Sequence, residues 1–322
     1  RMSEIIRGRI GGQPGAVSAA LVTGDRSAIT EDVLRDMRDS GLAHLLAISG
    51  LHVGLVAALV FGGLRALLAL MPAVALRFPI KKWAAGAGIL GACAYMALAG
   101  ATVPTQRAVM MATIALGAVL LDRSPFSLRL VAVAAVMVLV LQPEELMGPS
   151  FQLSFAAVTA LVAFYEAFGK RMTGWSGERS WLIRPWVYLA GIALTTLIAG
   201  AATGLIGAYH FNRVAHFSLI ANLLAVPLTG LWIMPAALLS VLAMPFGLED
   251  WPLWLMGQGV EALLWVARTV SHWPGAIGHL PQMPDWGFAA CVLGGLWLCL
   301  WRGRKRLLGL AGLALAILSF IT

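Results

Sequence analysis

Charged side chains are scarce in this chain. Aspartate, glutamate, lysine and arginine together make up 12% of the 322 residues, whereas an ordinary water-soluble domain carries about 25%. Hydrophobic residues make up 60% and recur in long runs along nearly the whole sequence. This composition excludes an ordinary soluble domain and indicates a helical membrane protein.

Motifs for catalysis and metal binding are also lacking. The three cysteines lie in hydrophobic segments without the CxxC or CxxH spacing of a metal or redox site. No HExxH motif, Walker loop, DxD motif or pair of intramembrane aspartates is present, so metalloproteolysis, ATP use and aspartyl proteolysis have no basis here. Ser49 and His52 are three residues apart, but no nearby acid orients the histidine as a base. We therefore expect no enzymatic activity, no metal and no cofactor.

Neither end of the sequence has the pattern of a natural terminus. The chain opens at Arg1 without the charged start, apolar core and cleavage site of a signal peptide. It ends at Thr322, directly after an apolar run. We expect a segment of a longer protein.

Ten hydrophobic segments reach, with their flanks, the length of about 17 to 25 residues that a membrane-spanning helix needs. They lie at 45–71, 83–100, 104–121, 128–142, 150–168, 186–209, 216–244, 252–271, 286–301 and 306–321. The predicted fold is therefore all-α, a polytopic membrane helix bundle of about ten transmembrane helices.

A short amphipathic helix precedes the first span. Thr30 can cap this helix, and Glu31 and Asp32 suit the positive end of its dipole. Its apolar and charged residues lie on opposite faces: Val33, Leu34 and Met37 against Arg35, Arg38 and Asp39. We predict a helix on the membrane surface, so that residues 1–43 form a linker with this helix and residues 44–322 form the transmembrane domain.

Basic residues predict the orientation in the membrane. The net charge is +8, and more than half of the 23 basic residues lie in four short segments, at 77–82, 123–129, 170–184 and 302–306. Short basic loops mark the cytoplasmic side. With ten crossings these four loops are all internal, and both chain ends lie outside the cell. The loop after the seventh span is the exception, because it should be internal but holds Glu249 and Asp250 and no base.

The seventh segment, 216–244, is longer than one untilted span and contains Pro227 and Pro235. Proline removes a backbone donor and kinks a helix, which a membrane protein tolerates where neighbours or water satisfy the freed carbonyl. The pattern fits either one kinked helix or two half-helices beside a cavity.

Polar residues recur at helical spacing within several spans. The stripes are Gln152, Thr159 and Glu166; Thr196, Thr203 and His210; Ser218, Asn222 and Thr229; and Gln258, Glu261 and Arg268. Interhelical hydrogen bonds explain any one stripe, whereas several together favour a cavity lined by neutral polar groups. Its sparse cations, Arg107, Arg213 and Arg268, would admit a polyanion more readily than a ring of carboxylates would.

Charged residues within or beside the spans have competing roles. Arg107, near the start of the third span, either lines a path or extends to the membrane interface, as we expect of Arg65. We expect Glu166 to pair with Lys170, four residues further on.

Four stretches of sequence resemble one protein family, in the order that the family shows. The first is HLLAISGLHVGLV at 44–56, preceded by GDRS at 24–27. The others are PTQRAVMMATIAL at 104–116, PSFQLSFAA at 149–157 and GAYHFNRVAHFSLIANLLAVPL at 207–228. Together they resemble the membrane domain of the ComEC-type competence proteins, and the resemblance covers nearly the whole chain.

The resemblance implies a channel for single-stranded DNA across the bacterial inner (plasma) membrane during natural transformation, with 44–322 as the competence channel domain. Full-length members of the family add an oligonucleotide-binding-type domain and a metallo-beta-lactamase-like domain. Neither is present here, and both would lie outside the cell. The implied partners are single-stranded DNA, the lipid bilayer, those flanking domains, a separate DNA receptor and a cytoplasmic motor.

We expect nine residues to line or gate the path: Ser49, His52, Gln106, Arg107, Gln152, Ser154, His210, Arg213 and Asn222. Aromatic residues nearby can stack on bases, as in single-strand binders, although apolar packing is their commoner role: Phe151, Phe155, Tyr209 and Phe211.

Three other functions stay open. A secondary transporter of a small solute would suit the proline-broken seventh segment, but no convincing internal repeat is visible. A membrane-embedded enzyme would use Ser49 and His52. The third alternative is a membrane anchor for a nuclease domain absent from this chain.

Overall fold

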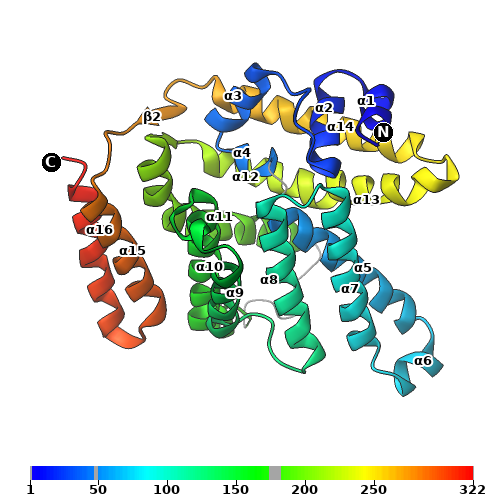
Figure 1. Cartoon of the computed structure of the whole chain (residues 1–322), viewed down its shortest axis with the longest axis horizontal. Coiled ribbons are helices and arrows are strands. Elements are labelled where there is room, and N and C mark those ends of the chain that lie inside the picture. Colours follow the sequence, from blue (N-terminus) through cyan, green and yellow to red (C-terminus); the bar gives the residue numbers. More distant parts are fainter. Residues whose placement is uncertain (1, 47–49, 174–182, 322) are drawn as a thin grey trace. The chain divides into compact units, whose positions relative to one another are not determined.

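The computed structural model describes residues 2–46, 50–173 and 183–321, and most of these are helical (Figure 1). The chain divides into two units. The first unit comprises Arg1–Pro125 and Leu224–Pro274, and the second comprises Phe126–Leu223 and Gly275–Thr322. Each unit therefore joins two stretches of chain that are far apart in the sequence.

The long helices begin and end close to where the hydrophobic segments predict them. They are α5 (Gly50–Ala69), α7 (Ile80–Leu98), α8 (Val103–Leu120), α9 (Leu128–Leu141), α10 (Pro149–Thr173), α11 (Arg184–Phe211), α14 (Asp250–Ser271), α15 (Asp285–Leu300) and α16 (Gly309–Leu318). The shorter elements are α1 (Met2–Ile10), α2 (Gly12–Thr23), α3 (Glu31–Asp39), α4 (Ala43–Leu46), α6 (Pro72–Arg77) and the 3-10 turns Pro143–Met147, Met244–Phe246 and Gly303–Leu308. The predicted helical class is confirmed.

Four helical segments of the described chain are long and apolar enough to cross a membrane: His52–Ala69, Pro149–Gly169, Trp186–Phe211 and Ser218–Phe246. α9 is apolar but has only 14 residues, which at about 1.5 Å per residue gives roughly 21 Å. The hydrocarbon core is about 30 Å thick. The predicted number of about ten crossings is therefore not confirmed.

The proline-containing seventh segment stays helical but changes its winding. It consists of α12 (Ser218–Pro227), the π-helical turn η2 (Leu228–Ile233) and α13 (Met234–Ala243). Pro227 has no N–H to donate, and a π turn is a known way for a helix to absorb a local break in its hydrogen-bond ladder. The segment is thus one helix with a widened turn directly after Pro227.

In the first unit, α5, α7, α8 and α13 pack around one apolar cluster. Val53, Ala92, Val109 and Met234 are buried in it. Tyr95 of α7 links this cluster to the N-terminal helices, because its hydroxyl donates a 2.7 Å hydrogen bond to the carbonyl of Leu21 in α2. That carbonyl lies in the last turn of α2, where no helical N–H remains to satisfy it.

Helices α1 and α2 have no counterpart among the sequence predictions. They pack on each other and on α14, and α2 is buried along most of its length. Gly15 permits the close approach of the pair, because a Cβ there would lie 3.3 Å from the carbonyl oxygen of Arg7. The predicted linker at the start of the chain is therefore a helical hairpin.

α3 has the predicted two faces. Met37 is buried while Arg35 and Arg38 are exposed, and the buried face contacts α14. The predicted cap is wrong in one respect, since Thr30 occupies the N-cap position without a side-chain cap bond. Its backbone N–H instead donates to Oε1 of Gln13 at 3.1 Å, which ties α3 to α2.

The GDRS loop between α2 and α3 is held together by its aspartate. Asp25 Oδ1 accepts hydrogen bonds from the backbone N–H of Ser27 at 3.1 Å and from its hydroxyl at 2.7 Å. Arg7 of α1 forms an ion pair with the other carboxylate oxygen. The hydrogen bonds from Ser27 are the main reason that the pKa of Asp25 lies below its ordinary value of 3.8, and the charge of Arg7 lowers it further.

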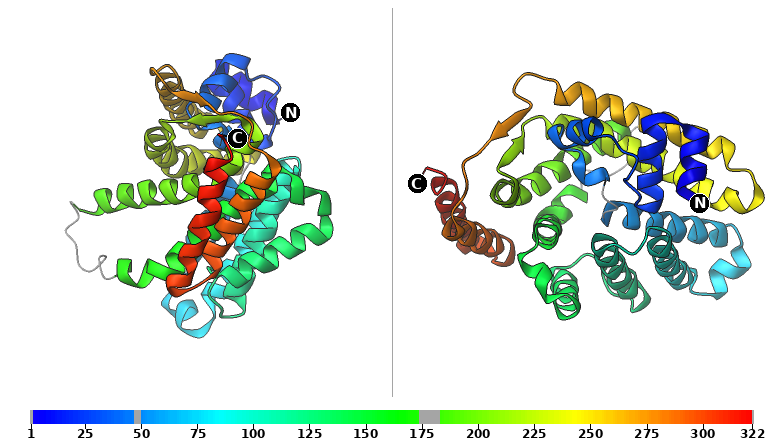
Figure 2. Two further views of the ribbon diagram at one scale, coloured as in Figure 1. Left: turned by 90° about the vertical axis from the view of Figure 1, so that its left-hand side faces the viewer. Right: turned by 45° about the horizontal axis from the view of Figure 1, so that its top comes forward.

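In the second unit, α15 and α16 form a tightly packed helical pair, seen side by side in Figure 2. A Cβ on Gly294 would lie 2.7 Å from the carbonyl oxygen of Gly309 and 3.0 Å from Cα of Gly312. Such small-residue contacts let membrane helices approach at backbone distance. A separate apolar cluster of this unit joins the pair to α11 through Ile206, Cys291 and Ala316.

Two short strands interrupt the helices of the second unit. β1 (Arg213–Ala215) and β2 (Ile277–His279) form an antiparallel ladder that pairs Arg213 with His279. Gly278 is required in β2, because a Cβ there would lie 2.8 Å from the ring of His216. This ladder was not predicted from the sequence.

Gly294→Ala should loosen the α15–α16 pair and lower the melting temperature in detergent. We expect a cost of about 1–3 kcal/mol, the usual range for overpacking, because the new methyl group would meet backbone atoms that cannot move aside. Gly295→Ala is the matched control, since nothing lies within 4 Å of a Cβ there. Equal melting temperatures for the two variants would contradict the close packing.

The Asp25 carboxylate should make stability depend on acid. Its pKa is lowered in the folded state, so its contribution is complete above about pH 4 and disappears as the pH falls through the lowered value. Melting curves at several pH values should show Asp25→Asn less stable than the unmodified chain near neutrality, with the difference vanishing in strong acid. Asp32→Asn, on the exposed start of α3, serves as the control. A difference that persists unchanged in strong acid would exclude this role for the carboxylate.

Candidate functional site

The nine predicted path residues fall into two sets, one in each unit, with one residue outside the description. His52, Gln106 and Arg107 belong to the first unit, and Gln152, Ser154, His210, Arg213 and Asn222 to the second. Ser49 lies outside the described residues. Its role in the path therefore stays a prediction.

The first-unit set lies where α5 and α8 pack together. His52 is completely buried, and Arg107 is 6% exposed. Each residue directly precedes a member of the apolar cluster, Val53 after His52 and Ala108 after Arg107. Of the two roles predicted for Arg107, burial favours an inward-facing guanidinium over one that extends to the membrane interface. Arg65, by contrast, is exposed near the end of α5.

The start of α8 is fixed by local hydrogen bonds. Gln106 Nε2 donates to the carbonyl of Ala101 at 2.8 Å. The hydroxyls of Thr102 and Thr105 are 2.8 Å apart. The PTQRA stretch thus forms a first helical turn whose polar side chains bond back to the preceding loop, which sets the direction of Arg107.

The second-unit set contains a direct bond between two predicted residues. His210 Nε2 donates to Oε1 of Gln152 at 2.7 Å, which joins α11 to α10. The other end of the amide, Nε2 of Gln152, donates to the carbonyl of Leu146 at 2.9 Å. Both helices contain a segment of membrane-crossing length. The bond gives this pair a defined geometry where the first turn of α10 meets the last turn of α11.

Aromatic side chains surround His210. Its ring contacts Tyr209 edge-on, with centroids 5.1 Å apart, and Phe288 of α15, with centroids 5.9 Å apart. Tyr209 stacks on Phe288 at 4.2 Å and donates its hydroxyl to Oδ1 of Asp285 at 2.8 Å. The cluster therefore has an apolar wall and a carboxylate at one edge.

The four predicted stacking aromatics have different surroundings. Phe151 and Phe155 are both buried, with ring centroids 4.4 Å apart, so packing accounts for them. Phe211 is exposed. Tyr209 packs on Phe288 and is half-buried.

The remaining second-unit residues lie on three different elements, β1, α12 and α10. Arg213 is half-buried on β1, beside His279 of β2. Asn222 Nδ2 donates to the carbonyl of Ser218 at 2.9 Å, while its Oδ1 is buried without a hydrogen-bond partner among the described residues. Ser154 is half-buried on α10. A buried amide oxygen such as Oδ1 of Asn222 usually accepts a hydrogen bond from a water or a ligand.

Three residues of the second unit lie beside predicted residues but were not themselves predicted from the sequence. Asp285, Phe288 and His279 follow the long helix α14, far along the chain from α10 and α11. Only Asp285 has a recognisable signal in the sequence, because it is a charged residue at the start of an apolar run. The other two become neighbours through tertiary packing.

Glu166 has two contacts that were not predicted. Its Oε1 accepts a 2.9 Å hydrogen bond from the backbone N–H of Leu128, and so it satisfies the start of α9. Its Oε2 lies 4.0 Å from a nitrogen of Arg302. The Lys170 side chain, its expected partner, lies outside the described residues.

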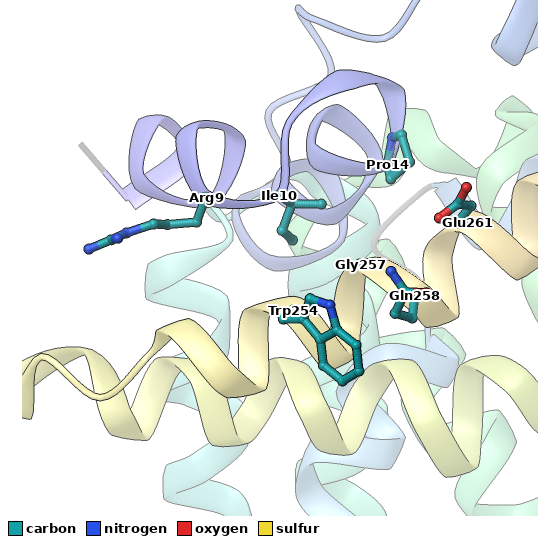
Figure 3. Close-up of a pocket in the computed structure, with 7 residues that line it drawn as sticks. All are labelled: Arg9, Ile10, Pro14, Trp254, Gly257, Gln258 and Glu261. Atoms are coloured by element: carbon teal, nitrogen blue, oxygen red, sulfur yellow. The ribbon is translucent and has the colours of Figure 1, made fainter.

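No group of three His, Cys, Asp or Glu side chains within the described ranges is arranged to hold a metal ion. A small pocket of 100 Å³ lies in the first unit between α1, α2 and α14 (Figure 3). Arg9, Gln258 and Glu261 supply its polar lining, with Trp254 beside them. Pockets for small organic ligands are typically about 300–1,000 Å³, so this one is too small for such a ligand.

Comparison with known proteins identifies relatives of the chain. The family model described as "Competence protein" matches residues 21–305. The "Competence protein ComA" of Neisseria gonorrhoeae is 32% identical over 82% of this chain and 36% of its own length. The "Uncharacterized protein YcaI" of Escherichia coli is 29% identical over 89% of this chain and 40% of its own length. The "ComE operon protein 3" of Bacillus subtilis is 29% identical over 69% of this chain and 26% of its own length.

No solved structure matches the chain. The chain spans between about a quarter and two fifths of the length of these relatives. The family match covers the four sequence stretches that resemble ComEC-type proteins, and with the apolar helices it indicates a membrane protein. The chain belongs to the competence protein family.

Proposed function

We propose that this chain forms a membrane path for single-stranded DNA across the bacterial inner membrane during natural transformation. Two of the named relatives are the Competence protein ComA and the ComE operon protein 3, which supports a role in DNA uptake. The finer role, a channel, is supported by polar side chains inside apolar helices. We place the chain in the inner membrane, and the basic-loop pattern supports an orientation with both chain ends external.

The observation that carries the proposal is the hydrogen bond between His210 and Gln152. Polar side chains inside membrane helices are costly unless they face one another or a water-filled path. Here an imidazole in the last turn of α11 and an amide in the first turn of α10 meet at one mouth of the proposed path, and both can exchange their mutual bond for bonds to a passing phosphate or base. Neutral groups of this kind bind a polyanion weakly enough to let it move on.

Asn222 and Arg107 add two further kinds of contact. The buried Oδ1 of Asn222 is an acceptor suited to a water molecule or to the amino groups of bases. Arg107 provides a cation held inside the first unit, and guanidinium groups match phosphate geometry. A few weak contacts would guide DNA without trapping it.

The proposed partners are single-stranded DNA and the lipid bilayer, together with an oligonucleotide-binding-type domain, a metallo-beta-lactamase-like domain, a DNA receptor and a cytoplasmic motor. Because no nucleotide-binding motif is present in this sequence, the driving force would come from the motor. We propose a passive channel rather than an enzyme.

Gln152→Ala and His210→Ala should each impair DNA entry while the protein remains in the membrane. A hydrogen bond to a charged group is worth about 1.5–3 kcal/mol, so we expect roughly tenfold or greater loss of uptake. The measurement is transformation frequency together with internalised labelled DNA, in cells with equal protein levels. Thr195→Ala is the matched control, because this residue of α11 lies outside the polar stripe and its hydroxyl bonds to the carbonyls of Gly191 and Ile192 in its own helix.

Arg107→Ala should impair uptake as well, and its control is Arg65→Ala on the exposed end of α5. Arg107→Lys should retain part of the uptake, since it keeps the charge but loses the planar guanidinium. Full uptake by Gln152→Ala, His210→Ala and Arg107→Ala would remove the case for a DNA path at these residues. Normal DNA entry with loss of strand degradation would instead favour a nuclease anchor, and a solute-dependent growth defect would favour a transporter.

A further inference from the structure

The exposed face of α14 carries an unusual mixture of side chains. Ten of its 22 residues are buried against neighbouring elements of the first unit. The exposed residues recur at helical spacing along one stripe: Trp251, Trp254, Gln258, Glu261, Trp265 and Arg268. The stripe thus contains three tryptophans, one amide, one acidic side chain and one basic side chain. Tryptophan is enriched at the level of lipid headgroups, where its ring is in apolar surroundings and its N–H is in wet ones.

A membrane-crossing α14 would place part of this stripe in hydrocarbon. Glu261 lies close to the middle of the helix and is exposed. A charged side chain at the centre of a bilayer is rare and normally faces the protein interior or water. Glu261 is exposed and lines the small pocket beside α1 and α2 (Figure 3), so a helix that spans would need water in that pocket at the depth of the hydrocarbon.

Both ends of α14 are held by the N-terminal helices. Near its start, Asp250 lies 3.1 Å from Nε of Arg9, the penultimate residue of α1. At its end, the hydroxyl of Ser271 donates a 2.8 Å hydrogen bond to Oδ1 of Asp36 in α3. The 22 residues between these contacts extend about 33 Å at about 1.5 Å per residue, which is close to the full thickness of the hydrocarbon core.

The chain that connects these two contacts is too polar for the hydrocarbon. If α14 crossed the membrane, α1 and α3 would lie at opposite faces, and the chain from Arg9 to Asp36 would cross beside it. That chain exposes Arg26, Ser27, Glu31, Asp32 and Arg35. Exposed loops and charges of this kind do not occur in the lipid-facing part of a membrane protein.

We propose that α14 lies in the plane of the membrane interface, with both of its ends and α1–α3 on one side of the bilayer and its tryptophan stripe against the lipid headgroups. The direction of the helix agrees with this placement. Within the first unit, α14 runs across the direction of α7 and α8, which pack on the membrane-length helix α5 (Figure 1). The placement is independent of whether DNA passes through the protein.

The β1–β2 ladder extends the argument to the preceding segment. Arg213 and His279 are paired in the ladder, so they lie on the same side of the membrane. The number of crossings between them must then be even. Since α14 does not cross, Ser218–Phe246 does not complete a crossing either, so this continuous helix also lies along the bilayer and not through it.

This arrangement removes the one conflict in the basic-loop pattern. Glu249 and Asp250, which a ten-crossing topology places inside the cell without a basic residue, now lie on the outer side. Removing two crossings, those of Ser218–Phe246 and α14, leaves the side reached after α15 unchanged. The basic segment at 302–306 is therefore still cytoplasmic. Eight crossings satisfy the same orientation rule as ten.

Cysteine labelling in sided membrane vesicles tests the placement. In full-length protein with Cys93, Cys291 and Cys299 replaced by alanine, Leu248→Cys and His272→Cys mark the two ends of α14, and both native side chains are exposed. Arg304→Cys marks the basic segment. We expect a membrane-impermeant maleimide to label Leu248→Cys and His272→Cys from the same side, and Arg304→Cys only from the other. Labelling of Leu248→Cys together with Arg304→Cys, opposite to His272→Cys, would overturn the proposal. If Cys291→Ala lowers the protein level, Cys291 is kept, because it is buried.

Depth measurements test the lipid contact itself. A bimane probe on Trp265→Cys should be quenched more by lipids brominated near the headgroup than by lipids brominated deep in the acyl chain. The reference is Leu197→Cys on the exposed face of α11, within a segment of membrane-crossing length, where the deep bromines should quench more. Stronger deep quenching at Trp265→Cys would mean that α14 crosses, and no quenching would mean that its stripe faces water. Either result would overturn the proposal.

Discussion

Hydrocarbon offers no hydrogen bonds, and this constraint governs where the chain can place its few polar groups. Inside an apolar helix a polar side chain bonds to a carbonyl of its own helix, as Thr203 does to Ala199, and near the helix ends polar side chains bond to one another, as His210 does to Gln152. At helix ends they replace missing helical bonds, as Tyr95 does for Leu21. The polar groups therefore mark both the joints between elements and the positions where function is to be sought.

Helix positions follow from the sequence because each long apolar run corresponds to one helix. Length alone does not reveal which helices cross, since α14 has 22 residues but is not among the four segments that are both long and apolar enough. α1 and α2 escaped prediction for a related reason, because their burial comes from contacts with each other and with α14. The β1–β2 ladder has three residues in each strand and joins segments about sixty residues apart, so no local pattern announces it.

The candidate site shows the same division between local and tertiary information. Gln152 and His210 were both predicted from polar stripes, yet a stripe fixes only the face of one helix and not the helix that it meets. Their pairing, and the approach of Asp285 and Phe288 through Tyr209, depend on the packing of α15 on α10 and α11. Phe151 and Phe155 fitted a base-stacking role equally well in sequence, and only their burial identifies them as packing residues.

The stripe on α14 shows how one pattern can have two physical meanings. Gln258, Glu261 and Arg268 at helical spacing fit a cavity lining when the helix is taken to cross the membrane, since polar residues must then face inward. In the structure the inward face is the apolar one, and the polar residues share the outward face with three tryptophans. An inverted polarity of this kind suits a helix at the interface, where one side meets protein and the other meets headgroups. The contacts of Arg9 and Asp36 at its two ends attach the charged helices α1 and α3 to this helix.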